Sequence, residues 1–191
     1  MRIAEIERKT KETAIKIALN LEGGEIRAST GVGFFDHMLT AFAFHGGFGL
    51  EVKCEGDLWV DCHHTVEDVG IVLGKAFLAA AGDRAGIVRF GSSLVPMDEA
   101  LARAVCDISG RAFLVVEAVF PQEKIGEYDA CMTVEFFRAF VTNAGITLHL
   151  CAEYGSNSHH MIEAIFKAAG RALREALEVK DGNIASTKGV L

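Results

Sequence analysis

Apolar and polar residues alternate near the start of the chain, which is the pattern of a strand with one buried face. Residues 12–21 (ETAIKIALNL) show this alternation and end at Glu22-Gly23-Gly24, a hairpin turn signal. Residues 25–30 are therefore expected to return as the second strand of a hairpin. A third strand is predicted at residues 48–55.

Two longer segments of the first half have helical spacing. Residues 34–45 contain no helix breakers and are followed by Gly46-Gly47, a common helix end. Residues 63–81 place apolar side chains three and four positions apart, from Val66 to Ala80. The first half is thus predicted to be two strands, a helix, a strand and a helix (ββαβα).

The second half repeats this order of elements. The predicted elements are strands at 101–109 and 111–120, a helix at 130–142, a strand at 146–153 and a helix at 159–177. The two strands that open this half meet near Ser109-Gly110. The order is again ββαβα.

The two halves also align residue by residue. The segment 37–50 matches 135–148, and His63-His64-x-x-Glu67 matches His159-His160-x-x-Glu163. The offsets are 135 − 37 = 98 and 159 − 63 = 96, so only two residues are lost between the matches. We therefore predict an internal duplication of about 95 residues. The predicted fold class is mixed α/β (α+β). Residues 1–92 would form the first half and 93–191 the second half of one compact unit.

Composition and charge narrow the classes of function. The 191 residues are 50% hydrophobic and 24% charged, which suits a packed globular core, and the net charge of −7 argues against a nucleic-acid partner. No signal-peptide pattern opens the chain, and its most apolar stretch, 69–81, is interrupted by Lys75. The five cysteines form no C-x-x-C pair and are expected to be reduced. We expect a cytoplasmic protein with no membrane partner.

The two histidine pairs carry the chemistry, because each is followed three residues later by a glutamate. On a helix, His63 and Glu67 stand four positions apart and can reach one ion, whereas His64 points about 100° away. A metal site needs three or four ligands, so one such helix is not enough. Two of them, related by the internal repeat or by contact between subunits, would supply two sites. Imidazole with carboxylate suits Mn, Fe, Zn or Ni.

Other residues near these motifs allow more than one interpretation. His37 is either a ligand or a packing histidine, and its repeat partner Glu135 can also bind metal. Asp61 and Asp68 either accept imidazole N–H bonds or favour the start of a helix, and the first interpretation is preferred for Asp61. Several basic residues cannot be ligands, and each taken alone suits a solvated surface charge: Arg89, Arg111, Lys167 and Lys188.

These motifs together resemble the imidazoleglycerol-phosphate dehydratase family over nearly the whole chain. The segments that carry the resemblance are 10–13 (TKET), 35–39 (FDHML), 61–68 (DCHHTVED), 89–91 (RFG), 107–111 (DISGR), 157–164 (NSHHMIEA) and 186–189 (STKG). The resemblance implies a duplicated fold with helices packed against two four-stranded sheets. It also implies a shell of 24 subunits, two Mn²⁺ ions per active site at subunit contacts, and dehydration of D-erythro-imidazole-glycerol phosphate to imidazole-acetol phosphate in histidine biosynthesis.

The resemblance also assigns roles to individual residues. The implied metal ligands are His37, His63, His64, Glu67, Glu135, His159, His160 and Glu163. The implied substrate-binding residues are Glu12, His45, Arg89, Arg111, Lys167, Ser186, Thr187 and Lys188. Glu12 matches the acidic residue that moves protons. The implied catalytic residues are therefore Glu12 and the histidines and glutamates of both His-His-x-x-Glu motifs. The expected division puts His63, Glu67, His160 and Glu135 on one ion and His159, Glu163, His64 and His37 on the other.

Two positions depart from the family pattern. Glu135 stands where many members carry a metal-binding histidine, and Cys62 occupies a position often held by aspartate. A carboxylate can replace an imidazole as a ligand, so Glu135 stays in the predicted set. Cys62 is expected to lie outside it.

Two other classes of function use similar residues. A metal-storage or metal-sensing protein would hold the ions without turnover, but it needs no phosphate anchor such as Arg89, Arg111 and Lys188. A metal-dependent phosphatase would activate water on the metal and release inorganic phosphate. The identity of the phosphorus-containing product separates the phosphatase from the dehydratase.

Overall fold

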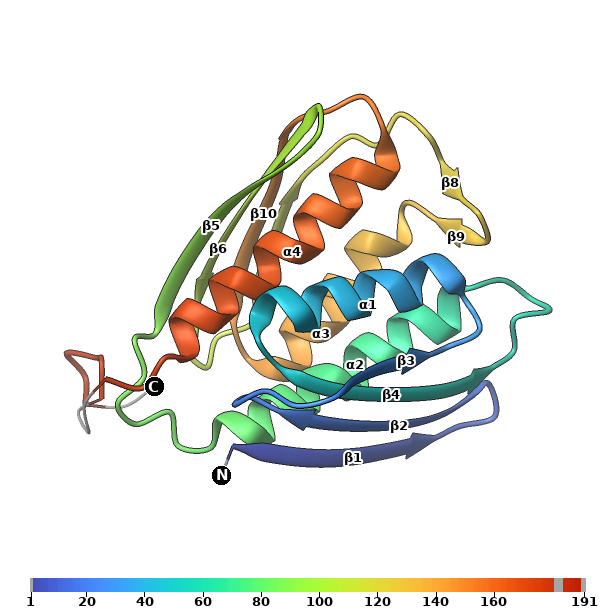
Figure 1. Cartoon of the computed structure of the whole chain (residues 1–191). Helices are drawn as coiled ribbons and strands as arrows, with labels where there is room; N and C mark the ends of the chain where they lie inside the picture. Colours follow the sequence, from blue (N-terminus) through green and yellow to red (C-terminus); the bar gives the residue numbers. More distant parts are fainter. Residues whose placement is uncertain (1, 181–183, 190–191) are drawn as a thin grey trace.

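Four helices lie between two four-stranded sheets in the computed structural model, which describes residues 2–180 and 184–189 (Figure 1). The first sheet contains β1 (Ile3–Lys9), β2 (Thr13–Asn20), β3 (Ile26–Ser29) and β4 (Gly49–Gly56). The second contains β5 (Phe90–Met97), β6 (Ala100–Asp107), β7 (Phe113–Glu117) and β10 (Thr147–Tyr154). The helices are α1 (Gly33–Gly46), α2 (His63–Ala81), α3 (Met132–Ala144) and α4 (Ser158–Leu177). A short hairpin, β8 (Lys124–Ile125) and β9 (Tyr128–Asp129), precedes α3.

The two sheets have the same topology. The strand orders are β1-β2-β4-β3 and β5-β6-β10-β7. In each sheet the first three strands of this order pair antiparallel, and the last strand runs parallel to its neighbour. The predicted α/β class with two four-stranded sheets is therefore confirmed. None of the helices in the described part of the chain is long and apolar enough to cross a membrane.

The strands differ from the sequence prediction in their number and in their pairing. Each half places three strands of its four-stranded sheet before its first helix, and the sequence predicted two, without β1 and β5. Both are edge strands, and charges in β1 and Gly91 and Pro96 in β5 weaken the strand pattern. The predicted hairpin between 12–21 and 25–30 is also wrong, since β4 lies between β2 and β3. The division predicted at residue 92 falls inside β5 and stays a prediction.

The helices form two layers between the sheets (Figure 1). α1 and α2 cover the first sheet, and α3 and α4 cover the second. Across the middle, α1 runs beside α4 in the same direction, and α3 runs beside α2. Phe42 of α1 and Phe140 of α3, which the repeat aligns, meet edge to face with ring centroids 6.1 Å apart. The duplicated halves thus share one aromatic core.

Two glycines let the paired helices approach closely. A Cβ atom at Gly170 of α4 would lie 2.3 Å from the Phe42 carbonyl oxygen of α1. A Cβ atom at Gly74 of α2 would lie 2.4 Å from the Phe140 carbonyl oxygen of α3. The repeat aligns Gly74 with Gly170 and Phe140 with Phe42, so both helix pairs use the same backbone contact. No side chain larger than hydrogen fits at either glycine without separating the helices.

We predict that Gly170→Ala lowers the free energy of unfolding by about 1–3 kcal/mol, because the added methyl overpacks a rigid backbone contact. Gly33→Ala is the matched control, since the Gly33 position has no neighbouring atom within 4 Å of the added Cβ. The control should keep or raise stability by up to about 1 kcal/mol through helix propensity. Urea denaturation measures both variants, and a Gly170→Ala protein as stable as the parent contradicts the prediction.

Candidate active site

His37 of α1 converges with His159 and Glu163 of α4. Their ligand atoms all lie within 4.8 Å of one another. The Nε2 atoms of His37 and His159 are each 3.2 Å from Glu163 Oε2. Glu163 is buried at 6% exposure, whereas the two imidazoles are accessible. Two imidazoles and one carboxylate form a donor set that suits a divalent transition metal. We call these three residues the α1–α4 trio, after the helices that carry them.

Lys167 lies one helical turn beyond the trio. Its Nζ is 2.8 Å from Glu163 Oε1, the oxygen atom that the two histidines do not use. Burial by itself would raise the pKa of Glu163, but the Lys167 ammonium and His37 outweigh it and hold that pKa below its ordinary value. Glu163 is therefore a carboxylate, the form a metal ligand requires.

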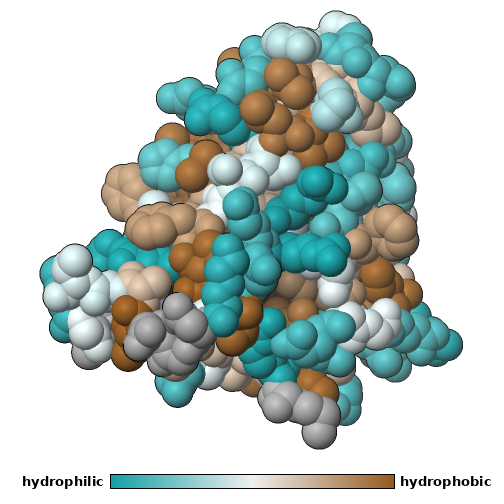
Figure 2. Space-filling view, turned by 60° about the vertical axis from the view of Figure 1, so that its left-hand side comes forward, coloured by the Kyte–Doolittle hydropathy of each residue, from teal (hydrophilic) through white to brown (hydrophobic). Residues whose placement is uncertain are grey.

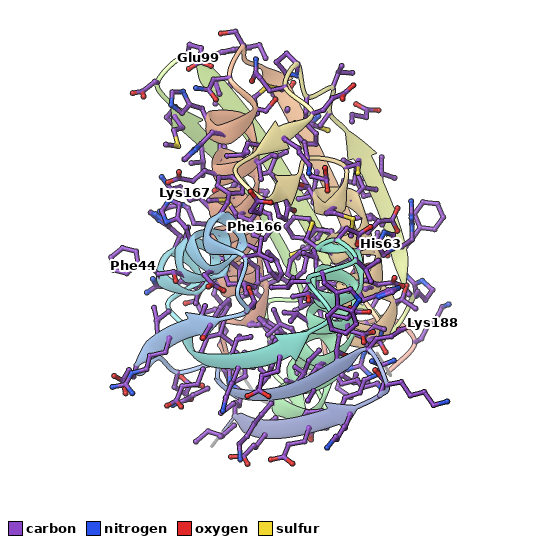
Figure 3. All side chains as sticks on the ribbon, turned by 90° about the vertical axis from the view of Figure 1, so that its right-hand side faces the viewer. Phe44, His63, Glu99, Phe166, Lys167 and Lys188 are labelled. Atoms are coloured by element: carbon purple, nitrogen blue, oxygen red, sulfur yellow. The ribbon has the colours of Figure 1, made fainter. Side chains whose placement is uncertain are left out.

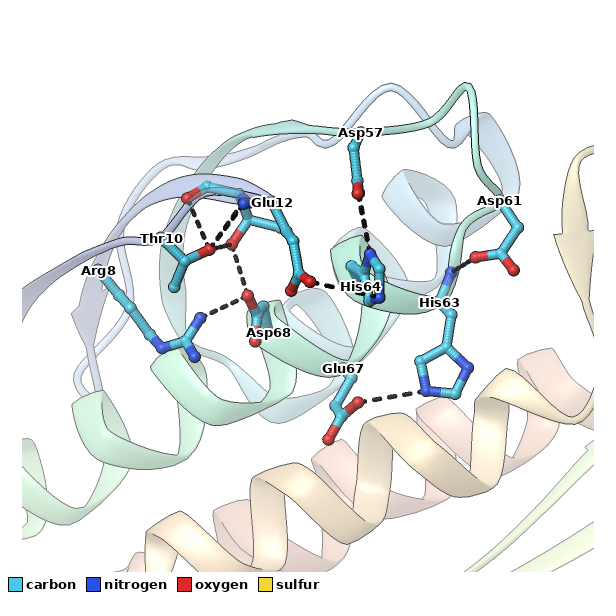
Figure 4. A network of polar contacts seen from close by, with 10 residues as sticks. Arg8, Thr10, Glu12, Asp57, Asp61, His63, His64, Glu67 and Asp68 are labelled. Carbon is cyan, nitrogen blue, oxygen red and sulfur yellow. Dashed lines mark hydrogen bonds and ion pairs between the residues drawn. The ribbon is translucent and has the colours of Figure 1, made fainter.

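The matching residues of the first motif are less converged. His63 Nε2 lies 3.2 Å from Glu67 Oε2 on α2 (Figure 4). Glu135 on α3 pairs with Arg138 one turn further along its own helix. Within the described part of the chain, the α1–α4 trio is the one group of three ligands that meets. His63 and Glu67 thus form a pair, and Glu135 lies on the neighbouring helix.

The second histidine of each motif is held by a carboxylate. His64 Nδ1 lies 3.0 Å from Asp57 Oδ2, and His160 Nδ1 lies 2.7 Å from Glu99 Oε2. These hydrogen bonds raise the pKa of both histidines. The contact with His160, together with the Ser156 amide, lowers the pKa of Glu99 to about 2. A carboxylate on one ring nitrogen is the usual arrangement behind a metal-binding histidine.

Glu12 lies in the turn between β1 and β2, near His64. Its Oε1 atom is 3.9 Å from His64 Nε2 (Figure 4). Thr10 Oγ1 accepts hydrogen bonds from the backbone N–H groups of Glu12 and Thr13 at 3.1 and 3.0 Å, which closes the turn. Thr13 in turn donates to Asp68 of α2. The turn that carries Glu12 is thus tied to the helix that carries the first histidine pair.

A second group of predicted residues includes two arginines beside Asp107 and the C-terminal segment that one of them contacts. Arg89 donates two hydrogen bonds to the Asp107 carboxylate, at 2.7 and 3.1 Å, and a third to the Ala185 carbonyl at 2.7 Å. Arg111 lies 3.6 Å from the same carboxylate with its side chain 66% exposed. Ser186 Oγ accepts from the Lys188 backbone N–H at 3.2 Å. We call the predicted members the basic cluster: Arg89, Arg111, Ser186, Thr187 and Lys188.

The comparisons with known proteins identify the family of the chain. The model of the family described as imidazoleglycerol-phosphate dehydratase matches residues 30–173, more than half of the chain. The chain belongs to the imidazoleglycerol-phosphate dehydratase family. It is therefore an enzyme, a dehydratase of the hydro-lyase class, and the family inferred from the sequence is confirmed.

Relatives and solved structures match over nearly their whole lengths. The chain is 59% identical to the imidazoleglycerol-phosphate dehydratase of an Exiguobacterium strain over 191 residues, covering 99% of this chain and 98% of that protein. The Streptococcus thermophilus dehydratase is 56% identical, with 100% of both chains covered. The crystal structure of the Staphylococcus aureus dehydratase superposes with a TM-score of 0.86 at 43% identity, covering 93% of this chain and 99% of that one. The Pyrococcus furiosus enzyme, in complex with (S)-C348, has a TM-score of 0.84 at 35% identity, covering 97% and 100%.

Two acidic residues next to the first histidine pair do not contact the imidazoles. Asp61 accepts a hydrogen bond from the His63 backbone N–H at 2.7 Å, at the start of α2. Asp68 is occupied by Arg8 and Thr13. The preference for Asp61 as an imidazole acceptor is therefore wrong, because its short side chain is used by the backbone two residues on.

The imidazole acceptors that the structure does contain were missed by the sequence reasoning. Asp57 lies seven residues before His64, and Glu99 lies 61 residues before His160. Neither spacing belongs to one helix or one strand. Only the turn after β4 and the turn between β5 and β6 bring these carboxylates to the start of α2 and α4, so no local signal marks them.

The two histidine motifs lie apart on the surface of this family member. Figure 3 shows His63 on one side of the molecule and Glu99 and Lys167, which contact the second motif, on the other. His45 lies in the last turn of α1, beside a groove of about 710 Å³ that Arg171 and Arg174 also line. Burial, with Lys167 and Arg171 nearby, lowers the pKa of His45.

Arg89 of the basic cluster contacts the end of α4 that lies far from the α1–α4 trio. The Arg89 backbone N–H donates to the carbonyl of Ala176, near the end of α4. Ala176 follows Glu163 by 176 − 163 = 13 residues, a distance of about 20 Å along a helix axis. One chain therefore places its α1–α4 trio and Arg89 of the basic cluster at opposite ends of α4.

Proposed function

We propose that this enzyme converts D-erythro-imidazole-glycerol phosphate to imidazole-acetol phosphate and water in histidine biosynthesis, with two Mn²⁺ ions in each active site. The convergence of His37, His159 and Glu163 carries the proposal, because ligand atoms from two helices lie within 4.8 Å of one another. Family membership supports the reaction.

The proposed ligand sets follow the internal repeat. The α1–α4 trio would be completed by His64 of another subunit, while His63, Glu67 and Glu135 would be completed by His160 of another subunit. The ligand roles of His64 and His160 are supported by their use of Nδ1 for carboxylates on their own chain, which leaves Nε2, beside Glu12 and Asp98, for an ion. Each set contains imidazole and carboxylate donors, which suit Mn²⁺.

The proposal requires a homo-oligomer, and we propose the 24-subunit shell that the family resemblance implies. The separation of about 20 Å between the trio and the basic cluster of one chain supports it, because a small phosphorylated imidazole cannot span that distance. The surface supports it as well. Leu94, Val105 and Phe113 expose apolar side chains on the outer face of the second sheet, and Figure 2 shows exposed apolar side chains at several places on one side of the molecule.

The residues of the chain divide the work of the reaction. Glu12 takes the carbon-bound proton, which is weakly acidic because no carbonyl group is adjacent to it. The chemistry supplied by the bound cations is Lewis-acid stabilisation of negative charge on the imidazole ring of the substrate. Arg111 and Lys188 anchor the phosphate through charge-assisted hydrogen bonds, and the basic cluster thereby orients the glycerol chain. Loss of the hydroxyl as water leaves an enol that becomes the ketone.

We predict that the purified protein binds about two Mn²⁺ per chain and forms the keto product from imidazole-glycerol phosphate only when the ions are present. Elemental analysis and product detection measure this after chelation and after return of Mn²⁺. Release of inorganic phosphate instead of the ketone would favour a phosphatase, and metal without turnover would favour storage. Chelation should also shrink the assembly if ligands from two chains share an ion.

Glu12→Gln should lower kcat by about 10²- to 10⁴-fold, because it removes the basic carboxylate but keeps the size and polarity of the side chain. Mn²⁺ content and KM should stay close to those of the parent. Glu7→Gln, which changes an exposed charge on the adjoining strand β1, is the matched control. Steady-state kinetics that leave Glu12→Gln within about threefold of the parent would assign the proton to another base.

Arg111→Ala should raise KM by about 10- to 150-fold, the equivalent of about 1.5–3 kcal/mol for one hydrogen bond to a charged group. Its metal content should not change, because Arg111 lies in the basic cluster and not among the ligands. Arg27→Ala, at an exposed arginine of β3, controls for loss of a positive charge. If the Arg111→Ala protein loses metal or keeps the KM of the parent, Arg111 has only a structural role.

A further inference from the structure

The carboxylates that hold the second histidines come from different elements in the two halves. Asp57 directly follows strand β4 in the first half, whereas Glu99 lies in the turn between β5 and β6 in the second. Both contact Nδ1 of their histidine, at 3.0 and 2.7 Å. The duplicated chain thus reaches the same contact by two routes.

The repeat explains why two routes are needed. Strands β4 and β10 match at an offset of 147 − 49 = 98, so Asp57 corresponds to Gly155, which has no side chain. The turn between β5 and β6 supplies Glu99 in its place. The equivalent turn of the first half, between β1 and β2, carries Glu12. Because Asp57 already occupies His64 Nδ1, Glu12 is left beside Nε2 at 3.9 Å.

Both oxygens of Glu99 are engaged. Oε1 accepts hydrogen bonds from the backbone N–H groups of Ser156 and Asn157, at 3.1 and 2.9 Å, in the segment that leads into α4. Oε2 contacts His160 Nδ1. A carboxylate can only accept here, so the neutral imidazole carries its proton on Nδ1 and its lone pair on Nε2. Glu99 therefore sets both the rotation of the His160 ring and its tautomer.

We propose that Glu99 and Asp57 are positioning residues that present His160 and His64 as Nε2 ligands, and that this division of labour leaves Glu12 free for proton transfer. The inference rests on the proposed function, because it takes His64 and His160 as ligands of the two ions. Glu12 and Glu99 occupy the same turn of the duplicated fold, yet one would serve the proton and the other the metal.

The test is a titration with Mn²⁺, followed through the electron paramagnetic resonance signal of the free ion. The parent should bind two ions per chain. Glu99→Gln should weaken one of them by about 10- to 100-fold, the usual effect of removing a partner behind a ligand, and leave the other unchanged. Asp57→Asn should weaken the other ion, and the double variant should weaken both. Glu55→Gln, at an exposed residue of β4, should bind as the parent does.

Kinetics separate the role of Glu99 from that of Glu12. Excess Mn²⁺ should restore kcat to the Glu99→Gln enzyme, because a weakened site can still be filled, but it should not restore kcat to Glu12→Gln. Glu99→Gln keeps an oxygen for the Ser156 and Asn157 amides, so the Tm of the metal-free protein should change little. A fall in Tm without a change in Mn²⁺ affinity would overturn the proposal, since Glu99 would then be structural.

The remaining outcomes also decide. Unchanged affinity for both ions in Glu99→Gln and Asp57→Asn overturns the positioning roles while the metal site stands. If Glu99→Gln does not fold, Asp57→Asn alone decides, since weaker binding of one ion supports the proposal and parental binding overturns it. A parent protein that takes up no Mn²⁺ overturns the metal centre of the proposed function, and these roles with it.

Discussion

The close contact of paired helices at Gly74 and Gly170 is the constraint on which the candidate site depends. Each glycine lets one helix rest against a carbonyl oxygen of its partner, which fixes how far apart the axes lie and how the helices are staggered. Glu163 stands seven residues, about two turns, before Gly170, so the stagger set there places it opposite His37. Contacts of 3.2 Å between ligand atoms would not survive a shift of one ångström in either helix.

The aromatic core keeps this stagger rigid. Phe42 and Phe140 meet at the centre of the duplicated unit, and Phe77 lies 5.1 Å from Phe140. Such interiors are packed as densely as organic crystals, so they transmit displacement instead of absorbing it. Burial of the Glu163 carboxylate is then tolerated because Lys167 and the two histidines surround it. The trio is a charged group built into a helix interface that apolar packing holds in place.

Much of this could be predicted from the sequence, because helices and repeats leave local signals. The helix at 63–81 was predicted at its observed bounds, and the repeat paired His37 with Glu135 as candidate ligands. The strands β1 and β5 were missed because both lie at the edge of a sheet. β1 carries several charged residues, and β5 contains a glycine and a proline, which weaken a strand pattern. Asp57 and Glu99 were missed because side chains far apart in sequence meet only through strand order. The separation of the basic cluster from the trio could not be predicted, because it depends on which end of α4 Arg89 contacts.

Duplication also explains why a complete site of the proposed kind cannot form within one chain. The repeat gives each chain two half-sites, but the helix pairs that carry them are joined through the shared phenylalanine core and cannot fold toward each other. His64 and His160 are fixed on their own helices by Asp57 and Glu99, so neither can turn to the half-site of the other motif. In the proposed function, neighbouring copies would complete these half-sites. Because every copy offers both kinds of half-site, such contacts would be heterologous and would lead to a closed assembly only when the rotation between copies closes.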